Sequence, residues 1–282
     1  MVSRSHRDVV TWNSELEFET IYMLQEILNI AIFQLNLVWE NPAANRSKMD
    51  EFLQKIGGTT DVVFLPEMFT TGFSMNVSEL AEPMDGKTIQ WMKKRCQEHQ
   101  LALCGSLIIQ ENGQYFNRLV FVEPSGEVQI YNKRHLFTMG NEENYFQKGM
   151  ERLIVHYKGW RICPLICYDL RFPVWSRNRN EYDLLVYSAS WPQSRKDVWN
   201  TLLKARAIEN QSYVVGANRV GVDGEKIAYS GNSQIFDAKG KCLSESKEGE
   251  EMIVSAEISY SELVKFRTSF PVLNDADSFS IE

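Results

Sequence analysis

Cys167 is the residue of this sequence best placed to act as a nucleophile. It closes the apolar run RICPLIC at 161–167, and a polar turn bounded by proline follows at once. A thiol at a strand end has a rigid backbone, and the next residue's N–H can point at a developing oxyanion. Tyr168 supplies such an N–H, whereas Cys163 is followed by Pro164, which has none. The alternative is a buried cysteine that acts as a small hydrophobe.

The proton acceptor for this thiol is not an obvious histidine. His6 lies in a polar N-terminal stretch, His99 ends a polar helix, and His156 alternates within a strand. We interpret His135 as a packing or hydrogen-bonding residue. The CPLIC spacing at 163–167 has no second cysteine pair or nearby histidine, so it does not indicate a zinc site.

Two other charged residues also close apolar runs. Glu67 is the E of FLPEMFTTGF and follows the predicted strand at 61–66. Lys133 is the K of IYNKRHLF and follows the predicted strand at 127–132. The alternative to a catalytic role is a solvated loop carboxylate for Glu67 and an ordinary surface cation for Lys133. The aromatic and small residues after Glu67 resemble a pocket wall; they are Phe69, Thr70, Thr71, Gly72 and Phe73. The apolar Leu136 and Phe137 after Lys133 indicate surroundings that are partly desolvated.

The elements that must position these residues alternate between apolar strands and polar helices. Strands are predicted at 29–37, 61–66, 101–109, 114–122, 127–132, 153–157, 161–167, 183–188, 212–217, 233–237 and 252–257. Helices are predicted at 41–56, 88–99, 173–179 and 194–211. Nearly continuous apolar runs such as DVVFLP and DLLVYSAS are typical of strands covered on both faces. Two sheets packed together and covered by helices, a four-layer αββα sandwich, follow from this pattern.

The last predicted helix has one apolar stripe. Val198, Leu202, Ala205 and Ile208 recur at spacings of four, three and three. Such spacing places them on one face, which we expect to pack on a sheet.

Composition excludes several classes of protein. The 282 residues are 44% hydrophobic and 24% charged, so a fibrous or intrinsically disordered chain is excluded. The net charge of −7 disfavours nucleic acid and anionic membranes as partners. Five cysteines at irregular spacing do not form a disulfide framework, which predicts a cytoplasmic protein. Neither a signal peptide nor a membrane span is indicated.

The three charged or nucleophilic segments occur in a recognisable order. FLPEMF, NKRHLF and LICYDLRFP together resemble the nitrilase superfamily of carbon–nitrogen hydrolases, with Lys133 66 residues after Glu67 and Cys167 another 34 residues on. The similarity continues through LLVYSASWP and YSGNSQIFDAKG. Within the superfamily, KRHLFTMGNEENY with CYDLRFP and SASWP is most similar to the ω-amidase branch. We therefore expect a single domain over 23–282, with 1–22 as a loosely attached extension that relatives generally lack.

The resemblance implies a role for each matching residue. It makes Cys167 the nucleophile, Glu67 the general base and Lys133 the oxyanion-stabilising cation of a Glu–Lys–Cys triad. A second glutamate between the lysine and the cysteine is common in the family. We expect Glu142 in this place, with Glu143 as the alternative. Neither a metal nor an organic cofactor is implied.

Substrate contacts follow less directly from the sequence. We expect a small pocket lined by Tyr168, Phe69, Phe73 and Trp191. An acidic substrate also needs a cation, and the sequence does not choose among the candidates Arg134, Arg171, Arg195 and Arg219.

The resemblance implies hydrolysis of the terminal carboxamide of small 2-oxo acid amides, such as 2-oxoglutaramate, through a cysteine thioester. Alternatives are a hydrolase of N-carbamoyl or aliphatic amides, and a catalytically silent binding protein. The only partners expected are the small amide substrate and further copies of the chain, in a homodimer with eight layers or a higher oligomer.

Overall fold

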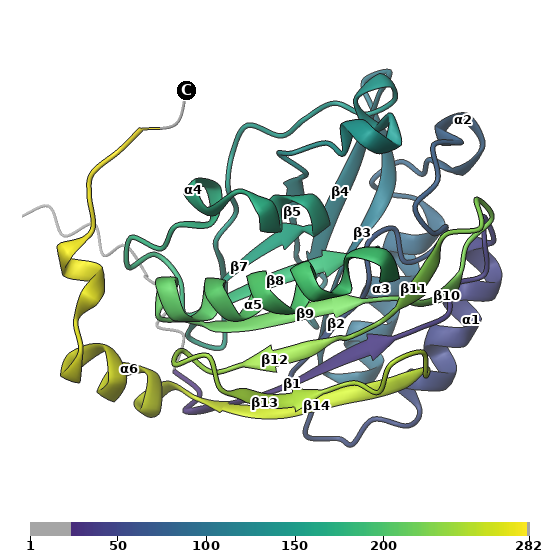
Figure 1. The fold of residues 1–282 in the computed structure, drawn as a ribbon. Coiled ribbons are helices and arrows are strands. Elements are labelled where there is room, and N and C mark those ends of the chain that lie inside the picture. The colour runs from purple at the N-terminus through teal and green to yellow at the C-terminus, as the bar shows by residue number, and fades with distance from the viewer. Residues whose placement is uncertain (1–23, 281–282) are drawn as a thin grey trace, which may run out of the picture.

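The computed structural model describes residues 24–280 and contains two six-stranded sheets packed face to face (Figure 1). The first sheet has the order β14-β1-β2-β3-β4-β5. Its strands are β14 (Met252–Ser259), β1 (Ile27–Gln34), β2 (Val62–Phe64), β3 (Ala102–Glu111), β4 (Gln114–Val122) and β5 (Val128–Asn132). The central strands β1, β2 and β3 are parallel, and the flanking strands pair antiparallel.

The second sheet repeats this plan. Its order is β13-β12-β9-β8-β7-β6, with β7, β8 and β9 parallel at the centre. The strands are β13 (Cys242–Glu245), β12 (Gln234–Phe236), β9 (Tyr213–Asn218), β8 (Leu184–Ala189), β7 (Trp160–Ile166) and β6 (Val155–Tyr157). The carboxyl ends of parallel strands share one edge of a sheet, so each sheet offers an edge on which functional residues can gather.

Side-chain alternation in the first sheet separates two cores. Phe33 and Val63 belong to the core that contains residues of helices α1 (Pro42–Leu53) and α3 (Lys87–His99). Ile32 and Phe64, one residue away, belong to the core shared with the second sheet. Alternate residues of a strand face opposite sides of the sheet, so this pattern fixes the register of the sandwich.

Helix α5 (Lys196–Asn210) covers the outer face of the second sheet (Figure 1). It packs so closely on β9 that a Cβ added at Gly216 would lie 2.4 Å from Leu203 Cδ1 and 2.8 Å from Trp199 Cζ2. The four layers are therefore α1 and α3, the two sheets, and α5. This confirms the αββα sandwich predicted from the sequence.

The predicted stripe on α5 is correct in part. Val198 and Leu202 are partly buried against the core, but the most buried face of the helix is shifted by about one residue. The most buried positions include Trp199, Leu203 and Ala207, whereas Ile208 is 50% exposed. The polar Arg206 and Asn210 are also buried on this helix. Hydrophobic periodicity cannot find a buried face that includes an arginine and an asparagine.

Several short elements were not predicted. They include the hairpin β10 (Val220–Val222) and β11 (Ala228–Ser230), the helices α2 (Val77–Leu80) and α6 (Tyr260–Ser269), and the edge strand β13. Helix α4 (Pro173–Ser176) is shorter than predicted. Among residues 24–280 no helix is both long enough and apolar enough to cross a membrane. The predicted extension 1–22 lies outside the described residues.

Candidate active site

Loops at the strand ends of both sheets line one cavity of about 260 Å³. Glu67 follows β2, Lys133 follows β5, and Cys167 follows β7. All three line this cavity. The structure therefore brings together the three residues that the sequence analysis predicted to form a catalytic triad.

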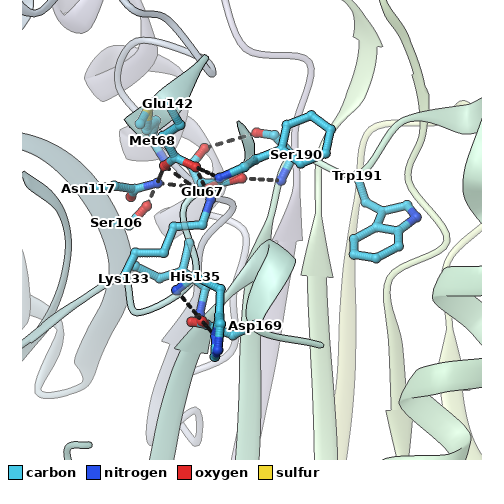
Figure 2. Close-up of polar contacts among 12 residues, drawn as sticks. Glu67, Met68, Ser106, Asn117, Lys133, His135, Glu142, Asp169, Ser190 and Trp191 are labelled. Carbon is cyan, nitrogen blue, oxygen red and sulfur yellow. Dashed lines mark hydrogen bonds and ion pairs between the residues drawn. The ribbon is translucent and has the colours of Figure 1, made fainter. Parts of the chain in front are cut away.

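The Glu67 carboxylate is fully buried and held by donors from three segments. Its Oε1 accepts hydrogen bonds from Lys133 Nζ at 2.8 Å and Asn117 Nδ2 at 2.9 Å. Its Oε2 accepts the Ser190 N–H at 3.0 Å (Figure 2). Its orientation is therefore fixed before any substrate binds.

Lys133 connects Glu67 to a second carboxylate. Its Nζ lies 2.8 Å from Glu142 Oε2, which also accepts the Phe137 N–H at 2.6 Å. Burial alone would lower the pKa of Lys133, but the charges of Glu142 and Glu67 raise it well above its usual value. The ammonium is therefore a permanent cation. The alternative Glu143 is exposed, so the structure places Glu142 and not Glu143 at this position.

Asn117 is a residue that the sequence analysis missed. It lies on β4, and its Nδ2 donates to Glu67 Oε1 and Glu142 Oε1, each at 2.9 Å. Its Oδ1 is buried and has no hydrogen-bond partner among residues 24–280. The only signal in the sequence is a polar Asn-Arg pair inside the apolar strand FNRLVFV. Asn117 holds the two carboxylates side by side.

Cys167 stands at a strained position. Its φ of +41° is unusual for a residue other than glycine, and it begins the 3₁₀ helix η3 (Cys167–Arg171). The N–H of Tyr168 lies in the first turn of η3, where backbone donors have no partner within the helix. Burial first, and then the negative charge of Glu67, raise the pKa of the Cys167 thiol, while Lys133 lowers it. The net pKa is high, so the resting group is a neutral thiol.

A second carboxylate network lies beside the first. Asp169 accepts hydrogen bonds from Tyr131 Oη at 2.7 Å and from the Ile166 N–H at 3.0 Å. It also lies 2.8 Å from His135 Nδ1 and accepts the His135 N–H at 3.1 Å (Figure 2). The His135 ring stacks on Phe172 with centroids 3.7 Å apart. The predicted packing and hydrogen-bonding role of His135 is confirmed.

The aromatic wall differs from the prediction at one residue. Phe73, Tyr168 and Trp191 line the cavity, but Phe69 does not. Phe69 is fully buried against the helices, with its ring centroid 6.4 Å from that of Trp91. The preceding Met68 has a φ of +46°, and this turn directs the next side chain into the core. Thr70 and Thr71, also expected in the wall, are buried outside the cavity.

The structure separates the four candidate arginines. Arg171 and Arg195 line the cavity, and Arg134 and Arg219 do not. Arg219 is fully buried and donates to the Leu37 carbonyl. The sequence analysis had left this choice open.

The cysteines and possible metal ligands add little to the site. All five cysteines are free, and Cys163 is fully buried. Within the described part of the chain, no group of three or more His, Cys, Asp or Glu side chains could hold a metal ion.

The sandwich and the cavity that collects Glu67, Lys133 and Cys167 define a class of enzyme. The model of the carbon–nitrogen hydrolase family matches residues 29–268, so the chain belongs to that family of hydrolases. A solved relative is the CN-hydrolase superfamily protein of Xanthomonas campestris that carries an arsenic adduct in its active site. It is 41% identical with a TM-score of 0.89, over 92% of this chain and 100% of that one.

Curated relatives narrow the class. The chain is 43% identical over 254 residues to omega-amidase YafV of Escherichia coli (strain K12). This alignment covers 90% of this chain and 98% of that protein. It is 36% identical over 252 residues to the 2-oxoglutaramate amidase of Bacillus subtilis (strain 168). That alignment covers 87% of this chain and 96% of the relative. The predicted similarity to the ω-amidase branch of the nitrilase superfamily is confirmed.

Proposed function

We propose that this protein is an ω-amidase that hydrolyses the terminal carboxamide of small 2-oxo acid amides, such as 2-oxoglutaramate, to the acid and ammonia. The observation that carries the proposal is the buried pair of carboxylates on Lys133, which lines the same cavity as Cys167. The similarity to omega-amidase YafV and to a 2-oxoglutaramate amidase supports the choice of substrate.

The first step forms a bond between sulfur and carbon. Glu67 accepts the thiol proton of Cys167, and the sulfur electron pair attacks the amide carbon. The carbonyl oxygen becomes an oxyanion, which the Lys133 ammonium and the Tyr168 N–H stabilise. One such donor contributes about 3–4 kcal/mol in the transition state. A neutral thiol beside an oriented carboxylate is the starting state that this step requires.

The second step breaks the carbon–nitrogen bond. Glu67, now a carboxylic acid, donates its proton to the amide nitrogen. The oxyanion collapses, ammonia leaves, and a thioester to Cys167 remains. Glu67 is again a carboxylate.

The third step releases the acid. Glu67 accepts a proton from water while the water oxygen attacks the thioester carbon, and the same two donors stabilise the second oxyanion. Collapse breaks the carbon–sulfur bond, and Glu67 returns the proton to the sulfur. The same carboxylate thus serves as base and acid in turn.

Glu142 and Asn117 act through Lys133 and Glu67. Glu142 raises the pKa of Lys133, so the lysine stays charged and cannot serve as the base. Asn117 keeps the two carboxylates near one cation. Glu142 and Asn117 therefore position the cluster, and Glu67 transfers the protons.

A substrate panel tests the proposed activity. Ammonia release from 2-oxoglutaramate should exceed release from N-carbamoyl-β-alanine, N-carbamoylputrescine and a simple nitrile. Preference for an N-carbamoyl or simple aliphatic amide would instead identify the alternative hydrolase. Labelling of Cys167 by a small electrophile at neutral pH, blocked by 2-oxoglutaramate, supports the enzyme. If no substrate is turned over and Cys167 is either not labelled or labelled equally with and without 2-oxoglutaramate, the chain is a silent binding protein.

We further propose a cytoplasmic homodimer in which residues 23–282 form one domain. The absence of disulfides among the five cysteines and the resemblance to the superfamily support this. Light scattering after gel filtration measures the oligomer. Removal of residues 1–22 should leave activity and melting temperature nearly unchanged, and a large loss of either would contradict the single-domain boundary.

A further inference from the structure

Two half-buried arginines of the cavity differ from Arg95 and Arg161, which are half-buried elsewhere in the protein. Arg95 and Arg161 are ion-paired with aspartates at 2.7 Å. The guanidinium groups of Arg171 and Arg195 form no ion pair with any carboxylate in residues 24–280. They lie over aromatic rings instead, 5.0 Å from the Trp191 centroid and 5.4 Å from the Phe137 centroid. Their hydrogen-bond donors are thus available to an anion in the cavity.

Trp191 links the two arginines. Its ring lies under the Arg171 guanidinium, and its Nε1–H donates to the Arg195 carbonyl at 2.8 Å. Arg171 ends the 3₁₀ helix that begins at Cys167, and Arg195 ends η4 (Gln193–Arg195) just after β8. One indole therefore contacts the Arg171 guanidinium and the backbone of Arg195, while the Arg195 guanidinium lies over Phe137.

The negative charge of Glu67 and Glu142 explains why an anionic substrate needs further cations in the cavity. Of the described residues, Lys133 is the one cation that contacts both Glu67 and Glu142, so the catalytic cluster carries one net negative charge when both carboxylates are ionised. An anionic substrate would be repelled by this cluster unless other cations bound its acidic end. Apart from Lys133, the only cationic side chains that line the described cavity are Arg171 and Arg195.

The other two candidate arginines make their contacts outside the cavity. The Arg219 guanidinium lies 4.7 Å from the Tyr229 centroid and donates to the Leu37 carbonyl at 3.2 Å. Arg134 Nη1 donates to the Gly149 carbonyl at 3.3 Å. Neither side chain lines the cavity.

We propose that Arg171 and Arg195 together form the subsite for the substrate carboxylate. They hold a short 2-oxo acid by its charged end and leave the terminal carboxamide at Cys167. This inference rests on the proposed function and adds its specificity: the enzyme selects amides that carry a carboxylate over neutral amides of equal length.

The test compares one charged and one neutral substrate. The kcat/KM ratio of 2-oxoglutaramate to pentanamide is measured for the wild type and for Arg171→Met and Arg195→Met. Methionine keeps an apolar stem against the aromatic ring and removes the charge. Each substitution should lower the ratio roughly 10–100-fold, mainly through KM for the acid, because a charge-assisted contact is lost.

Matched variants control for charge and folding. Arg179→Met removes an exposed arginine that pairs with Glu181 and should leave the ratio within about twofold, as expected for a surface ion pair. Arg195→Lys keeps the charge but loses the planar fork, so its ratio should fall between those of wild type and Arg195→Met. Equal alkylation of Cys167 by neutral iodoacetamide in all variants shows that the site is intact.

The outcomes separate this inference from the proposed function. A wild type that prefers 2-oxoglutaramate, together with arginine variants whose ratio is unchanged, overturns the arginine subsite alone. A wild type with no preference for the acid overturns the ω-amidase proposal and the subsite together. If a variant cannot be purified in a folded state, a protection experiment on the wild type takes its place. It compares 2-oxoglutarate with pentanamide as protectants of Cys167 against iodoacetamide. Protection by the dicarboxylate at lower concentration supports the subsite, and equal protection contradicts it.

Discussion

Two networks of buried carboxylates lie near Cys167, and they differ in what holds them. Asp169 accepts hydrogen bonds from the Tyr131 hydroxyl and from the backbone N–H groups of His135 and Ile166. Glu67 and Glu142 instead share one cation and one amide, Lys133 and Asn117. A carboxylate that accepts hydrogen bonds from neutral donors at fixed positions, as Asp169 does, holds the segments around it in place. Of the two carboxylates that share Lys133, Glu67 accepts and returns protons in the proposed mechanism, and Glu142 positions the lysine.

The position of Asp169 explains its structural role. It lies two residues after Cys167, while its partner His135 lies two residues after Lys133. The Asp169 network thereby connects the end of β7 to the end of β5. In the proposed mechanism, this connection sets the distance between Cys167 and Lys133, whereas the Glu67 network sets their protonation.

The largest expected effect is the loss of the nucleophile or the base. Cys167→Ala and Glu67→Gln should each lower ammonia release by about 10⁴-fold or more, because no other group can take over bond formation or proton transfer. The melting temperature should change little for Cys167→Ala. Near-normal turnover in either variant would remove that residue from the mechanism.

Loss of the shared cation should affect both reaction and fold. Lys133→Met removes an oxyanion donor and leaves two buried carboxylates without their cation, so turnover should fall at least about 10³-fold and stability should drop by about 3–5 kcal/mol. Thermal unfolding and steady-state kinetics measure the two losses. Adding Glu142→Gln should restore part of the stability but none of the turnover. Recovered turnover in the double variant would contradict the role of Lys133.

Asp169→Asn should lower the stability of the protein more than its turnover. An amide in place of the carboxylate turns a donor toward N–H groups, which costs about 1–3 kcal/mol for each unsatisfied group. At roughly 2–4 °C per kcal/mol, the melting temperature should fall by several degrees. Turnover at low temperature should fall by at most about 100-fold, the size expected for a small displacement of the reacting groups, and so by less than for Lys133→Met. A large loss of turnover without destabilisation would show that the two networks are not distinct.

Asn117 tests the comparison through the pKa of Glu142. Burial raises this pKa above its usual value, and the charge of Lys133 and the Asn117 amide oppose the increase. Asn117→Leu should raise that pKa further, so Glu142 becomes protonated at a higher pH and the acidic limb of the kcat/KM profile moves upward. We expect a loss of roughly tenfold at neutral pH, the size of one hydrogen bond to a charged group. Gln114→Leu on the same strand is exposed and serves as the control. An unchanged pH profile would limit Asn117 to packing.

The smallest expected effect is a shift in thiol reactivity. Glu67 raises the pKa of Cys167, so Glu67→Gln should move the midpoint of iodoacetamide alkylation to lower pH. Lys133 lowers that pKa, so Lys133→Met should move the midpoint to higher pH. Shifts of the opposite sign would mean that neither charge acts on the thiol.

The strand ends were predictable from sequence because apolar runs stop there. Runs such as DVVFLP and RICPLIC indicate buried strands, and the charged or nucleophilic residue that follows each run marks the edge of a sheet. Glu67, Lys133 and Cys167 were found in this way. The resemblance then supplied their roles and pointed to Glu142.

Contacts between distant segments were not predictable. Asn117 is one polar residue inside an apolar strand, and nothing local shows that it bridges two carboxylates. Phe69 was misplaced because the left-handed backbone at Met68 is not encoded by an obvious glycine. Helix α6 was missed because only Leu263 is fully buried along it. Tyr260 and Phe266 are only partly buried, and Val264 is 43% exposed. The choice among four arginines depended on tertiary structure alone.

The central claim is that the Glu67 network drives covalent chemistry at Cys167. The most direct measurement mixes the enzyme with 2-oxoglutaramate, quenches it with acid and determines the intact mass and the modified peptide. The account predicts an acyl adduct on the peptide with Cys167 that accumulates in the wild type and is absent from Cys167→Ala. Full ammonia release with no adduct, or with an adduct on Cys163 instead, would contradict it.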